Sequence, residues 1–215
     1  MENITTVAQL KALYGVPGEA STAKEIDPIS PHYRAMIKAS PFALLATAGP
    51  EGLDCSPRGD VPEFVRIHVM RSLTLPDRRG NNRVDSLRNI VRDARVVLLS
   101  MIPGMGNTLR VNGRAVVSIE PSLLASFAIA EKAPRSMTII SIKTIFFQCA
   151  RALVRSDLWN ASKHVSPAAL PAAGQIPAAL SAKRAPTAGS AEPIDGNAYD
   201  PRMARTCQTN NVVNL

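Results

Sequence analysis

The segment between residues 75 and 89 concentrates the side chains best suited to binding chemistry. It reads LPDRRGNNRVDSLRN, follows a run predicted as a strand, and opens a run predicted as a helix. Backbone N–H groups and the dipole at the start of a helix favour an anion at that point. Three arginines of the segment can add charge-assisted hydrogen bonds to such an anion: Arg78, Arg79 and Arg83.

Two amide side chains in the same segment favour phosphate as the anion. Asn81 and Asn82 can cap the predicted helix and donate hydrogen bonds to phosphate oxygens. The segment therefore predicts a phosphate site. The composition fits a second interpretation equally well, in which a solvated loop pairs its arginines with Asp77 and Asp85.

A second polar cluster is DCSPRGD, at residues 54–60. Ser56, Arg58 and Asp60 stand beside a proline and a glycine, which favour a tight backbone. Arg58 reaches the same phosphate as Arg83 if the strands that carry them are neighbours. The alternative is a β-turn whose Arg–Asp pair lies on the surface and contributes little.

A third candidate is NTLRVNGR, at residues 107–114. Thr108 and Arg110 point to one side of a predicted strand, and Leu109 and Val111 alternate with them. A polar side chain within a mostly buried strand needs a partner, and a bound ligand is one such partner.

The elements that must position these residues are predicted from apolar periodicity. Helices are expected near residues 7–14, 31–40, 83–92, 121–130 and 150–159. Short runs separated by turns predict six strands, at residues 42–47, 64–70, 72–75, 96–102, 108–119 and 137–148. The pattern indicates a mainly β fold with flanking helices, built on an antiparallel sheet or barrel.

Composition divides the chain into three parts. A helical segment covers residues 1–40, a strand-rich domain covers 41–160, and an Ala- and Pro-rich extension covers 161–215. In the extension we expect a short helix over residues 170–180, broken by Pro177, and a linker over residues 183–197.

The overall composition narrows the class of protein. The 215 residues carry a net charge of +8, which favours an anionic partner. Aromatic residues make up only 4% and the basic residues are spread along the chain, which disfavours nucleic-acid binding. No apolar run approaches the ~20 residues of a membrane span, and the N-terminus lacks the pattern of a secretory signal. We expect a cytoplasmic protein.

The cysteines provide no strong site. Cys55, Cys149 and Cys207 are widely spaced and form no CxxC pair, so we expect no metal site and no disulfide framework. Cys55 has no histidine near it in the sequence, which disfavours a role as a nucleophile. No residue stands out as an essential catalytic acid or base.

Four motifs in order resemble the pyridoxamine 5′-phosphate oxidase-like superfamily, and more closely its branch of FMN-binding proteins. They are CSPRGD, LTLPDRRGNNRVDSLRNI, IPGMGNTLRVNGRA and FFQCARALVRSDLW. The resemblance covers residues 25–160. It implies a six-stranded antiparallel Greek-key split β-barrel and a homodimer with FMN bound at the subunit interface.

The resemblance also implies roles for individual residues. The phosphate-binding arginine of the family matches Arg58, with Ser56 beside it, and the contacts to the flavin ring fall on Pro76 and Asp77. The Ser-Arg-Lys phosphate loop of the family aligns with Asn81, Asn82 and Arg83. A glutamine that reaches the flavin aligns with Thr108, and Arg110 stands close enough to replace it.

Departures from the family pattern bear on the substrate. The region that holds pyridoxal phosphate with a Tyr…Arg…Ser set reads SFAIAEKAPRSM here, and the C-terminal Arg-x-His motif is absent. We therefore expect an FMN-dependent oxidoreductase that acts on a small molecule other than pyridoxamine phosphate. The alternative is a non-catalytic protein that binds flavin, F420 or haem on the same fold.

Overall fold

The computed structural model describes residues 3–183 and residue 195. The chain divides into two compact units, residues 1–156 and residues 157–215. All the strands among the described residues belong to the first unit, which also carries the predicted site. The predicted three-part division of the chain stays a prediction.

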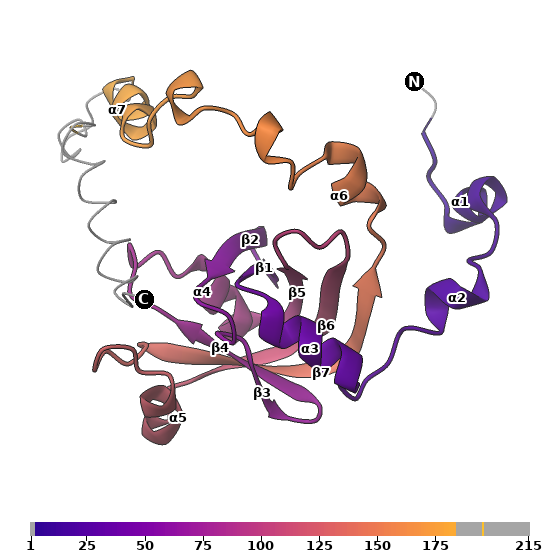
Figure 1. The fold of residues 1–215 in the computed structure, drawn as a ribbon, viewed down its shortest axis with the longest axis horizontal. Helices are drawn as coiled ribbons and strands as arrows, with labels where there is room; N and C mark the ends of the chain where they lie inside the picture. The colour runs from indigo at the N-terminus through magenta and orange to yellow at the C-terminus, as the bar shows by residue number, and fades with distance from the viewer. Residues whose placement is uncertain (1–2, 184–194, 196–215) are drawn as a thin grey trace. The chain divides into compact units, whose positions relative to one another are not determined.

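The first unit is built on one antiparallel sheet (Figure 1). Its strands are β1 (Phe42–Gly49), β2 (Gly52–Gly59), β3 (Arg66–Val69), β4 (Ser72–Asp77), β5 (Arg95–Met101), β6 (Thr108–Ser118) and β7 (Ser136–Gln148). Their order in the sheet is β2-β1-β5-β6-β7-β4-β3. The predicted mainly β, antiparallel architecture is confirmed.

The sheet has seven strands, so the prediction of six was wrong. The missed strand is β2, whose sequence GLDCSPRG has no apolar run and contains a proline. It pairs only with β1, and a proline is tolerated on such an edge strand because one side of its backbone needs no partner. The sheet runs from edge β2 to edge β3, and no pairing among the described strands closes it into a barrel.

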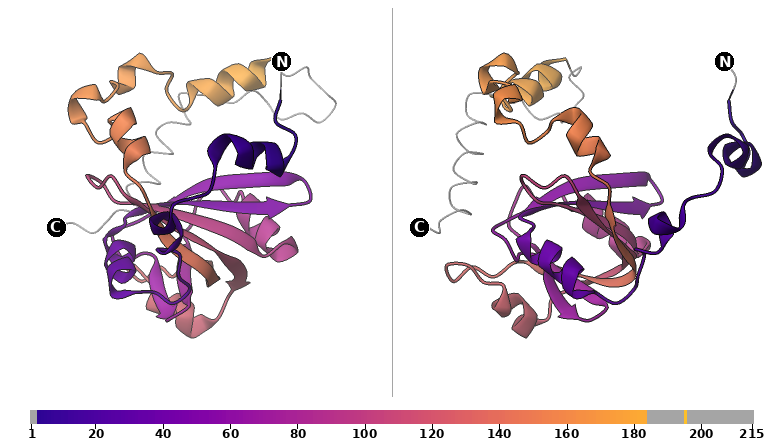
Figure 2. Two further views of the ribbon diagram at one scale, coloured as in Figure 1. Left: turned by 90° about the vertical axis from the view of Figure 1, so that its right-hand side faces the viewer. Right: turned by 45° about the vertical axis from the view of Figure 1, so that its right-hand side comes forward.

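Alternate residues of the strands face a common core. Ala43 and Leu45 of β1 are fully buried, as are Leu98 of β5 and Ile140 and Ile145 of β7. The sheet is strongly curved around this core (Figure 2). We call the face that carries these buried residues the inner face of the sheet, and the opposite face the outer face.

The helices of the first unit are α1 (Val7–Tyr14), α2 (Glu19–Thr22), α3 (Pro31–Ala39), α4 (Asp85–Arg92), α5 (Pro121–Ser126) and α6 (Arg151–Ser156). α3 starts where predicted, because the Ser30 hydroxyl accepts a hydrogen bond from the Tyr33 backbone N–H at 3.2 Å. Tyr33 and Ile37 of α3 join the core. α4 contacts β1, β2 and β6 and buries Ile90 against them.

The second unit contains α7 (Gln175–Ala182) and two 3-10 turns, Ala161–Lys163 and Pro167–Ala169. Pro177 does not break its helix as predicted. It occupies the first turn of α7, where a proline loses no helical hydrogen bond. Most of the predicted linker lies outside the described residues. No helix in the described part of the chain is long and apolar enough to cross a membrane.

One close contact links α4 to the end of β1. The buried Asn89 side chain donates to the Thr47 hydroxyl at 3.2 Å, and a Cβ on Gly49 would lie 2.1 Å from Asn89 Oδ1. We predict that Gly49→Ala lowers the free energy of unfolding by about 1–3 kcal/mol, because Asn89 must move. Urea denaturation measures this change.

The matched control is Gly18→Ala, where an added Cβ meets nothing within 4 Å. The double variant Gly49→Ala/Asn89→Ala should lose less stability than the sum of the two single variants, because the second change removes the clash. Strict additivity would contradict this packing account.

Candidate functional site

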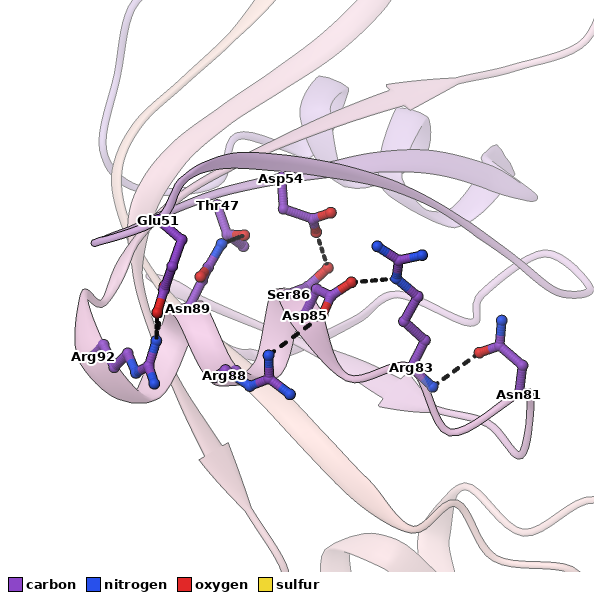
Figure 3. A network of polar contacts seen from close by, with 10 residues as sticks. All are labelled: Thr47, Glu51, Asp54, Asn81, Arg83, Asp85, Ser86, Arg88, Asn89 and Arg92. Atoms are coloured by element: carbon purple, nitrogen blue, oxygen red, sulfur yellow. Dashed lines mark hydrogen bonds and ion pairs between the residues drawn. The ribbon is translucent and has the colours of Figure 1, made fainter. Parts of the chain in front are cut away.

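The loop between β4 and α4 carries the predicted phosphate-binding residues. Asn82 adopts the left-handed conformation, with φ of 61°, which asparagine tolerates better than most residues. The Asn81 side-chain oxygen accepts the Arg83 backbone N–H at 3.0 Å (Figure 3). The loop is therefore held by its own amides, and it leads directly into α4.

A chain of hydroxyls fastens α4 to the edge strand β2. The Ser86 hydroxyl donates to Asp54 Oδ2 at 2.5 Å (Figure 3), and the Ser56 hydroxyl lies 2.8 Å from the same Ser86 oxygen. Because Ser86 has only one hydroxyl proton, and Asp54 accepts it, Ser56 is the donor to Ser86. The Asp54 carboxylate thus lies beside the first turn of α4, which the helix dipole favours.

Arg58 joins β2 to β4, two strands that are far apart in the order of the sheet. Its guanidinium donates from Nη1 to Asp77 Oδ1 of β4 at 2.9 Å, and both side chains are about four-fifths buried. The Arg58 Nε is buried and has no hydrogen-bond partner among the residues that the structure describes. A buried donor without an acceptor is costly, so this atom is the strongest local indication of a missing ligand group.

A second ion pair also joins the ends of β2 and β4, with the charges reversed: the arginine is now on the β4 side and the carboxylate is on the β2 side. Arg78, which follows β4, donates from Nε to Asp60 Oδ2 at 2.9 Å and from Nη1 to the Phe127 carbonyl at 2.6 Å. A small pocket of about 140 Å³ is lined by Arg58, Asp60 and Arg78 of these pairs, and also by Pro57, Phe64 and Pro76. The structure thus brings Arg58, Pro76 and Asp77 close together, and their assignment to a cofactor site stays a prediction.

The arginine at the start of α4 is also paired. Arg83 donates from Nε to Asp85, and Arg88 of the next turn lies 3.7 Å from the same carboxylate. The hydrogen bond from Arg83 holds the pKa of Asp85 below its ordinary value. The alternative interpretation of this loop is thus correct for Arg83 and Asp85, whereas Asp77 pairs with Arg58 from another strand.

Thr108 and Arg110 are not brought to this cluster. Arg58 pairs with Ala43 across the ladder, Ala43 with Ser100, and Ser100 with Leu109, which places Leu109 on the inner face in the same row as Arg58. Its neighbours Thr108 and Arg110 therefore face outward. On the outer face Arg110 donates to Asn112 Oδ1 at 2.9 Å, and its guanidinium lies 5.7 Å from the centre of the Phe146 ring.

Sequence reasoning missed Arg135 as a member of the site. Its guanidinium donates to Asn82 Oδ1 at 2.6 Å, and its backbone N–H donates to the Asp77 carbonyl at 3.1 Å. Arg135 immediately precedes β7, whose first residue Ser136 pairs with Asp77. Only this pairing of β4 with the start of β7 could have indicated the contact, because 53 residues separate Arg135 from Asn82.

The remaining candidate chemistry is sparse. No group of three or more His, Cys, Asp or Glu side chains that could hold a metal occurs among residues 3–183 and 195. Cys55 and Cys149 are exposed free thiols. Cys207 lies outside the described residues.

Comparisons with known proteins place this arrangement in a family. The family model of pyridoxamine 5′-phosphate oxidase matches residues 29–149, which is more than half of the chain. The chain belongs to this family. The matched segment contains the whole sheet, the loop before α4 and Arg135. None of the curated proteins matches the chain.

Solved structures with a similar fold include three proteins of different description. HupZ of Group A Streptococcus is 16% identical, with a TM-score of 0.46, over 56% of this chain and 94% of its own. An F420 reductase is 17% identical, with a TM-score of 0.41, over 54% and 98%. An FMN-binding protein from Syntrophomonas wolfei is 12% identical, with a TM-score of 0.42, over 53% and 82%.

The Arg83–Asp85 pair yields a prediction about titration. Arg83→Gln removes the hydrogen bond that chiefly lowers the pKa of Asp85, so that pKa should rise towards its usual 3.8. NMR titration of the Asp85 carboxyl carbon measures the change. Arg88→Gln is the comparison, and its effect should be smaller because Arg88 is farther from the carboxylate.

The same pair has a defined effect on the pH dependence of stability. Because the folded-state pKa of Asp85 is lowered, the stabilisation is present above the ordinary carboxyl pKa and is lost as pH falls through the folded-state value. Arg83→Gln should therefore flatten the loss of stability in acid. An unchanged Asp85 pKa in this variant would refute the pairing.

Proposed function

We propose that this protein is an FMN-dependent oxidoreductase of the split-barrel type that acts on a small molecule other than pyridoxamine phosphate. The carrying observation is the buried Nε of Arg58, a donor with no acceptor, next to a loop that presents amide and guanidinium donors. The family membership of the chain supports the same conclusion.

The residues present fit the phosphate end of FMN. An arginine carries five N–H donors, and Arg58 uses one of them on Asp77, so it can bind a phosphate oxygen without giving up its ion pair. Asn81, Asn82 and Arg83 contribute further donors from the loop, and Arg135 contributes from the start of β7. Arg58 and Asp77 link β2 to the end of β4, from which this loop starts, and this arrangement supports a site for a phosphate monoester.

The chemistry itself would come from the flavin, which supplies transfer of a hydride or of two electrons at its ring. The part of this chain is to bind and orient that group. Pro76 and Asp77 end β4 next to Arg58, and they are the candidates for contact with the ring. The Ser56–Ser86–Asp54 chain keeps β2 and α4 at a fixed separation, and so holds Arg58 and the loop in register.

The resemblance assigns contact with the flavin ring to Thr108 of β6, or to Arg110 in its place. One copy of the chain does not bring these residues to the phosphate donors. Thr108 and Arg110 face outward, away from Arg58, so they do not share a face with the phosphate donors of their own chain. In a homodimer, the outer face of one copy can supply the ring contacts, and the inner face and loop of the other copy can supply the phosphate donors. This supports a homodimer in which the outer face takes part in the interface.

The phosphate site is tested by comparing two forms of one cofactor. The double variant Arg58→Ala/Arg83→Ala should weaken FMN binding about a hundredfold or more, since each charge-assisted hydrogen bond contributes about 1.5–3 kcal/mol. Riboflavin, which lacks the phosphate, should bind the double variant and the parent protein alike. Flavin fluorescence titration measures both affinities.

The control is Arg151→Ala/Arg155→Ala, which removes the same charge from exposed positions of α6. Equal FMN affinity in the parent protein and the Arg58/Arg83 variant would refute the site. The absorption spectrum of the purified protein distinguishes the cofactor, because a flavin, a deazaflavin and a haem absorb at different wavelengths.

The outer face near Arg110 supports the proposed homodimer. Phe42 and Leu44 of β1, Leu99 and Met101 of β5 and Phe146 of β7 form an apolar patch there, and none of the five is buried. Apolar side chains that share one face of a sheet and stay partly exposed are typical of an interface. We name these five residues the apolar patch.

We predict that Leu99→Asp converts a dimer into a monomer, because a carboxylate in the middle of the apolar patch cannot be desolvated without a partner. Sedimentation velocity measures the mass. Val91→Asp, at an exposed position on α4, is the control and should leave the dimer intact. A parent protein that sediments as a monomer at micromolar concentration would contradict the homodimer.

A further inference from the structure

A second and larger hollow lies on the outer face of the sheet, beyond the apolar patch. Its volume is about 650 Å³, and strands β1, β2, β5, β6 and β7 all line it. This volume falls within the range of small-molecule sites, which is about 300–1,000 Å³. We name this hollow the outer groove. Its lining includes neither Arg58 nor the loop before α4.

Small side chains and an irregular pairing open the outer groove. Ala46 and Ala48 of β1 and Val97 of β5 provide its apolar lining at the centre of the sheet. The pairing of β6 with β7 shifts between Asn112 and Gly113, which leaves Lys143 as the extra residue. Such a bulge re-aims a side chain, and here Lys143 lines the groove.

The charges on the outer groove are not balanced. Arg114 and Lys143 both line it, and neither side chain forms a hydrogen bond or salt bridge with another residue in the described part of the chain. Arg114 nevertheless lies near Asp93, because its charge helps to lower the pKa of that carboxyl. The third cation, Arg95, donates hydrogen bonds to Asp93, and these bonds, together with the charges of Arg95 and Arg114, lower the pKa of Asp93 to about 2. No carboxylate is among the described residues that line the groove. Lys143 therefore lies beside an apolar surface with no acidic partner among those residues, and Arg114 shares Asp93, which stands outside the lining, with Arg95.

One wall of the outer groove is held in place by neighbours. The Asn112 side chain donates to the Thr144 hydroxyl at 2.9 Å and accepts from Arg110 Nε at 2.9 Å. Both ends of the amide are thereby engaged, so the wall is fixed before a ligand arrives. A preformed wall reduces the entropy lost on binding.

We propose that the outer groove binds a small organic anion with an apolar body, such as an aromatic carboxylate. Arg114 and Lys143 bind the carboxylate, and the apolar body lies against Ala46, Ala48 and Val97. Charge complementarity favours a small anion over a second copy of the chain as the occupant of the outer groove. A second copy related by two-fold symmetry would bring the cations of both copies together with no anion between them. The proposal is independent of the cofactor assigned above.

The test compares an anion with its neutral analogue, on the full chain. 2-Naphthoate and 2-naphthamide have the same ring system and differ in charge. Isothermal titration calorimetry should show naphthoate binding about tenfold more tightly or better, because it gains charge-assisted hydrogen bonds. Arg114→Gln/Lys143→Gln should abolish this preference and leave the affinity for naphthamide unchanged. Both positions are exposed, so the fold should tolerate the changes.

Two further variants complete the test. Arg151→Gln/Arg155→Gln removes equal charge from α6, outside the groove, and should preserve the preference for naphthoate. Ala46→Phe fills the apolar part of the groove and should weaken both ligands. Equal affinities in the parent protein, or a preference that survives in the Arg114/Lys143 variant, would overturn the proposal. Binding to the Leu99→Asp variant but not to the parent would show that a second copy covers the groove, and would also overturn it.

Discussion

The curvature of a single antiparallel sheet is the constraint on which the rest of the molecule depends. In the sheet order β2 and β4 are separated by four other strands, yet Arg58 of β2 and Asp77 of β4 lie 2.9 Å apart. Burial of the inner-face leucines and isoleucines against one another drives this approach. The ion pairs add little net free energy, because the cost of desolvating two mostly buried charges offsets their attraction. The ion pairs specify how β2 and β4 are positioned against each other.

The region where β2 meets the end of β4 is rich in paired charges. Arg58 and Arg78 pair with carboxylates across it, and Arg83 pairs with Asp85 farther along the loop before α4. Without these partners the like charges would repel one another. Each guanidinium has more N–H groups than its carboxylate uses, so in the proposed site a phosphate would meet donors that the ion pairs already orient.

The two faces of the sheet serve different chemistry. The inner face and the adjoining loop hold the proposed phosphate donors, whereas the outer face carries the apolar patch and the outer groove. β6 contributes to both faces, because residues next to one another along this strand point to opposite sides of the sheet. Arg110 connects the two outer features, since it contacts Phe146 of the apolar patch and Asn112 of the outer groove. A ligand in the groove and a second copy on the patch would therefore lie side by side.

The sequence by itself determined the elements whose signals are local. The apolar runs of β1, β5, β6 and β7, the Ser30 cap of α3 and the cationic loop before α4 all depend on residues within a few positions of one another. The motif resemblance also identified the family. Only the tertiary structure decided that β2 is a strand, that Arg135 reaches Asn82, and that Thr108 and Arg110 face away from Arg58. The physical reason is that each of these depends on strand register. Register is set by the fit of distant strands around one core, and no local pattern of residues records it.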